Sequence, residues 1–244
     1  MKQNNHSITH SVNGIRDFFR NFGEFLKFCL KTAVTWFEGN PNKAIGVQCI
    51  GKIVIIGNGP SAGAFDWMSA KAKGYALLCV NAFAAKNDAF FQMKPQYYTV
   101  IDPTFYQNDG DYGAATQSIL RALERVDWPM TLICLRGQQL PLDNPNIHTV
   151  HVSDIIFEGG WNTLKYWLYQ KNLATYRLQN VVTCALFFCL TAHTECICLT
   201  GVEHDLHRAL RVDEHNEVYC DNKHFYGQGR QKLTGKSIEK GELY

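Results

Sequence analysis

Branched apolar residues occur in short blocks from residue 52 onward, and segments with helical spacing separate most of these blocks. The blocks predict strands at 53–57, 75–80, 97–101, 130–135, 148–152 and 196–200. The intervening segments predict helices at 62–73, 84–93, 112–126, 162–170 and 183–194. Strands with so few polar positions suit a parallel sheet that is covered on both sides. The alternation therefore predicts an α/β fold, with a doubly wound, mostly parallel sheet and helices on both faces.

Residues 12–38 carry a different pattern, which predicts an amphipathic helix. Apolar residues recur there at steps of three and four, from Ile15 through Phe22 to Trp36. The opposite face carries basic residues, namely Arg16, Arg20, Lys27 and Lys31. Such a helix packs on the domain, pairs with a second copy or lies on a membrane surface, and the first two are favoured. Because a turn-rich segment follows, we expect an N-terminal extension, 1–43, and one α/β domain, 44–244.

The composition limits the class of protein. At 244 residues and 46% hydrophobic, the chain can bury one sizeable core. Its net charge of +2 is too small to make nucleic acid the expected partner. Nine cysteines, an odd number with several inside apolar runs, indicate a reducing compartment. The polar N-terminus has no signal-peptide core, so we expect a cytoplasmic protein, with the inner face of the membrane as the alternative location.

The first predicted strand runs into a turn with the sequence GNGPS, residues 57–61. Gly57 and Gly59 allow a sharp turn and a close approach to a ligand, and Pro60 suits the first turn of a following helix. The free N–H groups at such a helix start favour a phosphate. The spacing differs from the six-residue dinucleotide fingerprint, and no Gly-Lys-Ser/Thr follows as in a Walker loop. The turn therefore predicts a nucleotide-type ligand, but not a standard NAD or ATP site.

Small or polar residues stand at the carboxyl ends of four predicted strands. These residues are Asn58 and Ser61 in the turn, Asn81, Asp102 and Gly201. Ligands of open α/β sheets bind beyond the carboxyl ends of the strands. Each residue has an ordinary turn or capping role as the alternative, but together they predict one shared pocket.

Three motifs resemble the bacterial sialyltransferases of glycosyltransferase family forty-two. KIVIIGNGPS at 52–61 looks like that family's strand and Gly-Asn-Gly-Pro-Ser turn. CVNAF at 79–83 is similar to its Cys-Asn-Gln-Phe segment. The helix from Thr183 into ICLTGV, 197–202, is similar to its helix that leads to a strand and Ser-Gly-Ile-Asp. The order of the motifs agrees over residues 52–228, and the identity is concentrated in these short segments.

The resemblance implies a modified nucleotide-binding α/β fold and transfer of sialic acid from its CMP-linked donor to a hydroxyl of a surface glycan. No cofactor or metal is implied beside this donor. Asn58 and Asn81 would bind the cytidine phosphate and ribose region, and Gly57, Gly59 and Ser61 would shape the turn. The remaining donor-binding candidates are Asp102, which stands where the family has Asn, Thr183, Gly201 and Tyr226.

Residues 202–228 are rich in His, Asp, Asn and Tyr and follow a strand end, which predicts a lid-like loop. HFYGQ at 224–228 resembles the family's His-Tyr-x-Gly-His segment, in which a His serves as general base. Gln228 stands at the place of the second His, so His224 is the candidate base and His204 is the next. A histidine suits this role because its pKa lies near neutrality.

Two other functions compete with sialyl transfer. Asp109-Gly-Asp111 resembles the Asp-x-Asp signature of metal-dependent nucleotide-sugar transferases, although a turn and cap explain it more simply. Adjacent ligands in the 203–207 loop rarely converge on one metal, and Cys196-x-Cys198 is a weak metal signal. The other alternative is a non-catalytic nucleotide-binding or scaffold protein that docks through 12–38. In each case we expect a homo-oligomer, assembled by self-association through 12–38, or peripheral membrane contact there.

Overall fold

The structure is a computed structural model, and it describes residues 3–39, 45, 50–86, 88–106, 110–178, 180–203, 206–224 and 227–233. Six parallel strands form its main sheet, in the order β5-β4-β3-β2-β1-β6. The strands are β1 (Lys52–Ile56), β2 (Tyr75–Val80), β3 (Tyr97–Thr99), β4 (Met130–Leu135), β5 (Ile147–Val152) and β6 (Cys196–Thr200). The prediction of an α/β fold with a parallel sheet is confirmed, because all six predicted strands are present and pair in parallel.

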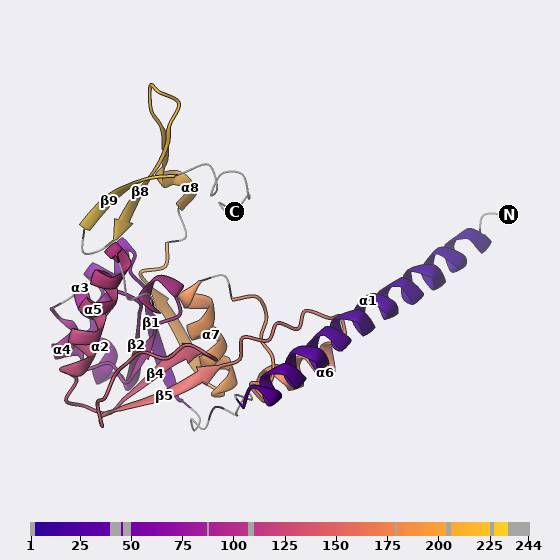
Figure 1. Ribbon diagram of the computed structural model, residues 1–244, viewed down its shortest axis with the longest axis horizontal. Coiled ribbons are helices and arrows are strands. Elements are labelled where there is room, and N and C mark those ends of the chain that lie inside the picture. The colour runs from indigo at the N-terminus through magenta and orange to yellow at the C-terminus, as the bar shows by residue number, and fades with distance from the viewer. Residues whose placement is uncertain are drawn as a thin grey trace.

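Helices cover both faces of this sheet (Figure 1). One face packs against α2 (Trp67–Ala72), α3 (Phe83–Lys86), α4 (Phe90–Met93) and α5 (Gly110–Glu124). The other face packs against α7 (Val181–Thr191). In β1, Val54 and Ile56 join the first core cluster while Ile53 and Ile55 join the second. A strand buried on both faces needs apolar residues at every position, which explains the unbroken run in the sequence.

Two predicted helices are each divided in two. The segment predicted as one helix at 62–73 forms a 3₁₀ helix, η1 (Pro60–Ala64), and then α2. The break occurs because the Asp66 side chain accepts a hydrogen bond of 2.9 Å from the Ser69 N–H and caps a new helix. The segment 84–93 forms the single turns α3 and α4, separated by residues 87–89. A second 3₁₀ helix, η2 (Pro103–Tyr106), follows β3, and α6 (Asn162–Gln170) has its predicted bounds.

The strand order reverses beside β1. The chain passes from β1 to β5 in one direction and returns through α6 and α7, which places β6 on the free side of β1. Loops diverge at such a switch point, and the crevice at the carboxyl ends of the two strands is the usual ligand site in open α/β sheets. The 57–61 turn follows β1, and the segment 201–203 follows β6, so both lie at this switch point.

Residues 202–228, predicted as a lid-like loop, contain regular structure instead. They include α8 (Leu206–Ala209), β7 (Leu210–Val212) and β8 (Val218–His224), and β9 (Gly227–Lys232) completes an antiparallel sheet. The many polar residues of these strands hide the strand pattern in the sequence. In the sheet, side chains on paired strands also contact each other, as the Arg230 guanidinium does over the Tyr219 ring, 4.5 Å from its centroid. This small sheet stands beyond the carboxyl end of the main sheet (Figure 1).

The N-terminal helix α1 (Gln3–Phe37) projects from the domain (Figure 1). It is attached along one side, where Phe28 packs on Phe157 in a third core cluster with Ile155 and Leu168. Near this cluster the Gly160 N–H donates a hydrogen bond of 2.7 Å to Asn21 Oδ1. Among the helices that the structure describes, none is both long and apolar enough to cross a membrane.

Candidate functional site

The turn after β1 and the segment after β6 are in direct backbone contact at the switch point. The Gly57 N–H donates to Thr200 O at 2.8 Å, and the Gly59 N–H donates to Gly201 O at 2.9 Å. A Cβ on Gly57 would collide with the Gly201 carbonyl, and Gly201 has a φ of +69°. The glycines of the turn therefore allow two segments of the chain to pack closely against each other, whether or not a ligand also binds there.

A carboxylate occupies the helix start where the sequence predicts a phosphate. The Ser61 N–H donates to Glu203 Oε1 at 2.7 Å, and the Gly201 N–H donates to Ser61 Oγ at 2.8 Å. A Cβ on Gly59 would collide with the other carboxylate oxygen. The pKa of Glu203 is lowered, because partial burial raises it but the hydrogen bonds from Ser61 lower it by more. Glu203 is thus an internal anion at the candidate phosphate position.

Two asparagines at the ends of neighbouring strands have buried oxygens without partners in the described residues. The Asn58 amide donates to Val80 O at 3.4 Å, which leaves Asn58 Oδ1 without a donor. Asn81 has a φ of +47°, its N–H donates to Thr99 O at 2.8 Å, and its Oδ1 also has no partner. Buried acceptors are almost always paired in folded proteins, so two such atoms at and beside the switch point indicate a missing donor.

Tyr98 fixes the backbone of Asn81. The Tyr98 ring is fully buried, its hydroxyl donates to Asn81 O and it accepts a hydrogen bond of 3.1 Å from the Ala84 N–H. Thr99, the next residue, has a buried Oγ1 without a partner in the part of the chain that the structure describes. Because Tyr98 and Val100 belong to the core cluster under α5, Thr99 faces the side of the sheet that α7 covers.

The other predicted site residues are placed less directly. Asp102 follows β3 at the carboxyl edge, half-buried, and its carbonyl accepts from the Phe105 N–H at 3.0 Å. Thr183 belongs to the capping box of α7: its N–H donates to Asn180 Oδ1 at 3.0 Å, and its Oγ1 donates to Asn180 O at 2.6 Å. The Thr183 hydroxyl is therefore engaged in starting the helix.

The candidate bases lie at the limit of what is described. His224 is the last residue of β8 and pairs with Gly227, but its side chain is outside the described part of the structure. His204 and Tyr226 lie outside the described residues altogether. The same holds for Asp109, whereas Asp111 lies in α5 with an undescribed side chain.

The described thiols fit structural roles. Every cysteine that the structure describes is a free thiol. Burial raises the pKa of Cys79 and of Cys184, which keeps both protonated and unreactive. Within the described ranges, no three His, Cys, Asp or Glu side chains come together in a way that could hold a metal ion.

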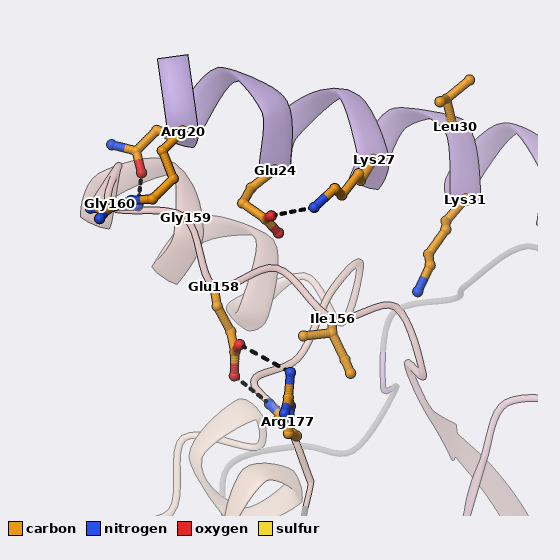
Figure 2. Close-up of a pocket in the computed structure, with 11 residues that line it drawn as sticks. Arg20, Glu24, Lys27, Leu30, Lys31, Ile156, Glu158, Gly159, Gly160 and Arg177 are labelled. Atoms are coloured by element: carbon orange, nitrogen blue, oxygen red, sulfur yellow. Dashed lines mark hydrogen bonds and ion pairs between the residues drawn. The ribbon is translucent and has the colours of Figure 1, made fainter. Parts of the chain in front are cut away.

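A groove of about 680 Å³ lies elsewhere, between α1 and the loop after β5 (Figure 2). Lys27 pairs there with Glu24 at 2.7 Å, and Arg177 lies 4.0 Å from Glu158. Lys31 points into the groove from α1. Its walls are open and its charges are largely paired, so it does not have the convergent, buried polar groups of the switch point.

The sequence points to the strand ends but misses two residues there. Its pattern suggests Glu203 only as one of several adjacent metal ligands, whereas Glu203 contacts Ser61 across the switch point. Thr99 falls within a predicted strand, and its pattern gives it no role. The available signal for Glu203 is its position two residues after Gly201, on the segment that faces the 57–61 turn.

A search of protein-family models, curated proteins and solved structures found no match to this chain.

Proposed function

We propose that this chain is a glycosyltransferase that uses a CMP-linked sugar of the sialic acid type as donor and a glycan hydroxyl as acceptor. The observation that carries the proposal is the pair of buried, unpartnered oxygens, Asn58 Oδ1 and Asn81 Oδ1, at the ends of β1 and β2. The motif resemblance supplies the donor class. Transfer on a surface polysaccharide or lipopolysaccharide is the physiological setting that it suggests.

Amide oxygens match a nucleoside better than they match a phosphate. They accept hydrogen bonds, and ribose hydroxyls and the cytosine amino group donate them. A phosphate at neutral pH offers acceptor oxygens and would be repelled by such atoms. Asn58 and Asn81 are therefore assigned to the cytidine and ribose, which leaves the phosphate to the 57–61 turn.

We infer that the phosphate takes the place of the Glu203 carboxylate at the turn. The Ser61 N–H is then free, and the segment that carries Glu203 leads directly into α8 and the small sheet. Few other N–H groups of the turn are available, because the Gly59 N–H is bonded to Gly201 and Pro60 has none. So sparse a set of donors suits the single phosphate of a CMP-sugar rather than a diphosphate.

The reaction needs a base for the acceptor hydroxyl. As the acceptor oxygen bonds to the anomeric carbon, the bond from that carbon to the CMP phosphate oxygen breaks, and the base takes the hydroxyl proton. His224 is assigned to this role, with His204 as the second candidate, because a neutral imidazole accepts a proton near pH 7. His224 ends β8. That strand belongs to the small sheet, which stands beyond the carboxyl end of the main sheet (Figure 1), the end at which the donor is proposed to bind.

Nucleotide binding is tested by thermal unfolding of the full chain with CMP, UDP, GDP or ATP. We expect CMP to stabilise the protein most. Glu203→Gln removes the charge that competes with the phosphate, so CMP should bind about tenfold more tightly to it, a gain of roughly 1.4 kcal/mol. Glu195→Gln is the matched control, because Glu195 precedes β6 at the opposite end of that strand and should leave the affinity unchanged.

Transfer is tested with CMP-sialic acid, alone and with a galactosyl acceptor, by measuring released CMP. We expect release that depends on His224 and is unaffected by EDTA. Activity that EDTA abolishes and Mn²⁺ restores would instead favour the metal-dependent transferase and give Asp109 and Asp111 a role. The proposal would be rejected, and the scaffold alternative favoured, if no CMP were released with or without the acceptor and CMP did not stabilise the protein.

A further inference from the structure

One face of α1 gathers the largest set of exposed apolar side chains that the structure describes. Of sixteen large apolar residues that are exposed, nine lie on this helix, and Phe37 is 88% exposed. We call this set the outward face: Ile15, Phe18, Phe19, Phe22, Leu26, Leu30, Val34, Trp36 and Phe37. A soluble protein rarely exposes so many neighbouring apolar side chains without a partner for them.

The outward face continues onto the domain. The ring of Trp161, just before α6, lies 6.0 Å from the Phe18 ring and 5.9 Å from the Phe25 ring. Tyr166 and Trp167 on α6 are about half exposed. The apolar surface is therefore shared by two helices, and aromatic rings make up much of it.

The geometry of the helix separates this face from the attached side. Residues advance by about 100° around an α-helix, so the outward face spans about 160°, from Phe18 and Trp36 at one edge to Val34 at the other. Asn21 and Phe28, which contact the domain, lie to one side of it. The outward face is therefore wider than the narrow seam of a two-stranded coiled coil.

The charges beside the outward face do not suit a pair of α1 helices. One edge carries Arg16 and Lys27, whereas the other carries the uncharged Asn21, Phe25 and Thr32. In an antiparallel pair the cationic edges would meet and repel each other. In a parallel pair each cationic edge would meet an uncharged edge, so neither arrangement gives the flanking ion pairs of a coiled coil.

The same charges complement an anionic surface. Asp17 and Glu24 are neutralised on the helix by Arg20 at 3.0 Å and by Lys27 at 2.7 Å. Arg16 and Lys31 have no acidic partner among the described residues, so α1 has a net positive charge. Of the two, Arg16 stands at the edge of the outward face, whereas Lys31 points into the groove (Figure 2). Long basic side chains beside a wide aromatic face are typical of helices that lie in the headgroup region of a bilayer.

We infer that α1 docks by its outward face on an anionic membrane surface and lies in the plane of that surface. The apolar rings enter the boundary between headgroups and acyl chains, and Arg16, at the cationic edge of the outward face, reaches a lipid phosphate. This inference is independent of the proposed transferase function, because it rests on α1 and α6 and involves no residue of the switch point.

The test is flotation of the full chain with vesicles of phosphatidylcholine alone or of equal parts phosphatidylcholine and phosphatidylglycerol. We expect about tenfold or more tighter binding to the anionic vesicles at low salt, and weaker binding as salt is raised. Arg16→Gln should lower that preference several-fold, whereas Lys31→Gln, in the groove, should change it less. Binding to both kinds of vesicle should be at least tenfold weaker when Phe19 and Leu26 are both replaced by Asp.

Leu190→Asp is the matched control, because Leu190 on α7 is 61% exposed and lies outside the outward face. It should bind vesicles like the parent chain, and circular dichroism of all variants checks that they fold. Failure of the parent chain to float with anionic vesicles at low salt would overturn the inference. It would also be overturned by a stable dimer that the Phe19 and Leu26 double variant dissociates while vesicle binding is unchanged, because a second copy would then be the occupant.

Discussion

The switch point and the outward face of α1 are opposite kinds of exception to ordinary burial. At the switch point, polar oxygens of Asn58 and Asn81 are buried without partners among the described residues. On α1, large apolar rings are exposed without a cover from the described part of the chain. A buried polar group and an exposed apolar patch are the two observations that carry information about function, because most residues follow the usual distribution. The first points to a small polar ligand and the second to an extended apolar surface.

The two regions also differ in how the chain itself uses them. The turn after β1 is closed by contacts with Gly201 and Glu203, so any ligand must compete with the protein. The outward face is largely open to solvent. Binding at the switch point should therefore be sensitive to small changes in the turn, whereas binding through α1 should depend on total apolar area and charge.

The largest effect is expected from Gly201→Ala, which tests how tightly the switch point is closed. Gly201 has a φ of +69°, and a Cβ there would lie 2.7 Å from Gly57 O and 2.8 Å from Ala62 Cβ. Backbone strain and collision together should lower the free energy of unfolding by about 4 kcal/mol, measured by urea denaturation.

Gly74→Ala separates these two causes. Gly74 has a φ of +79°, but a Cβ added there would have no described atom within 4 Å, so only the backbone strain applies. We expect a loss of about 1 kcal/mol. Equal losses at the two glycines would contradict the close packing of the two turns.

A smaller effect is expected where α1 is attached. Phe28 is 8% exposed and packs on Phe157, whereas Leu30 on the same helix is 67% exposed. Phe28→Ala should cost about 3 kcal/mol of the local stability of α1, seen as faster amide exchange and proteolysis of the helix. Leu30→Ala should cost less than about 0.5 kcal/mol. The reverse order would mean that the outward face is the attached one.

The smallest effect concerns the charge of Glu203. Its pKa is lowered in the folded chain by the hydrogen bonds from Ser61, so the ionised form stabilises the fold above the pKa of the unfolded chain. That contribution should be lost as the pH falls below about 4 and through the lowered pKa of the folded state. The difference in thermal midpoint between the parent chain and Glu203→Gln should therefore shrink on acidification. If the difference in thermal midpoint did not change with pH, the charge of the Glu203 carboxylate would not contribute to the stability of the fold.

Much of the fold could be predicted from the sequence. β2, β4, β6 and α6 have the predicted bounds, because blocks of branched apolar residues and helical spacing are local signals. The division of 62–73 depends on the single cap at Asp66, and the strands in 202–228 depend on pairing between distant residues. Such contacts leave little trace in a polar sequence.

The candidate site could be located but not described. Strand ends placed Asn58 and Asn81 together because parallel strands end at one edge of the sheet. The contact between Ser61 and Glu203 joins residues 142 positions apart, and no local pattern specifies it. Likewise the apolar spacing of α1 predicted a helix, but which of its sides meets the domain is decided by Asn21 and Phe28 and their partners after β5.

The hydrogen bond between Asn21 and Gly160 gives α1 a fixed point of attachment. Eighteen residues of helix precede Asn21, and at 1.5 Å per residue they extend about 27 Å from that point. A helix that lies in the plane of a surface over this length orients the domain relative to that surface, because the domain is attached to it through Asn21 and Phe28. The carboxyl edge of the sheet would then be presented to that surface in one orientation, without free rotation of the domain.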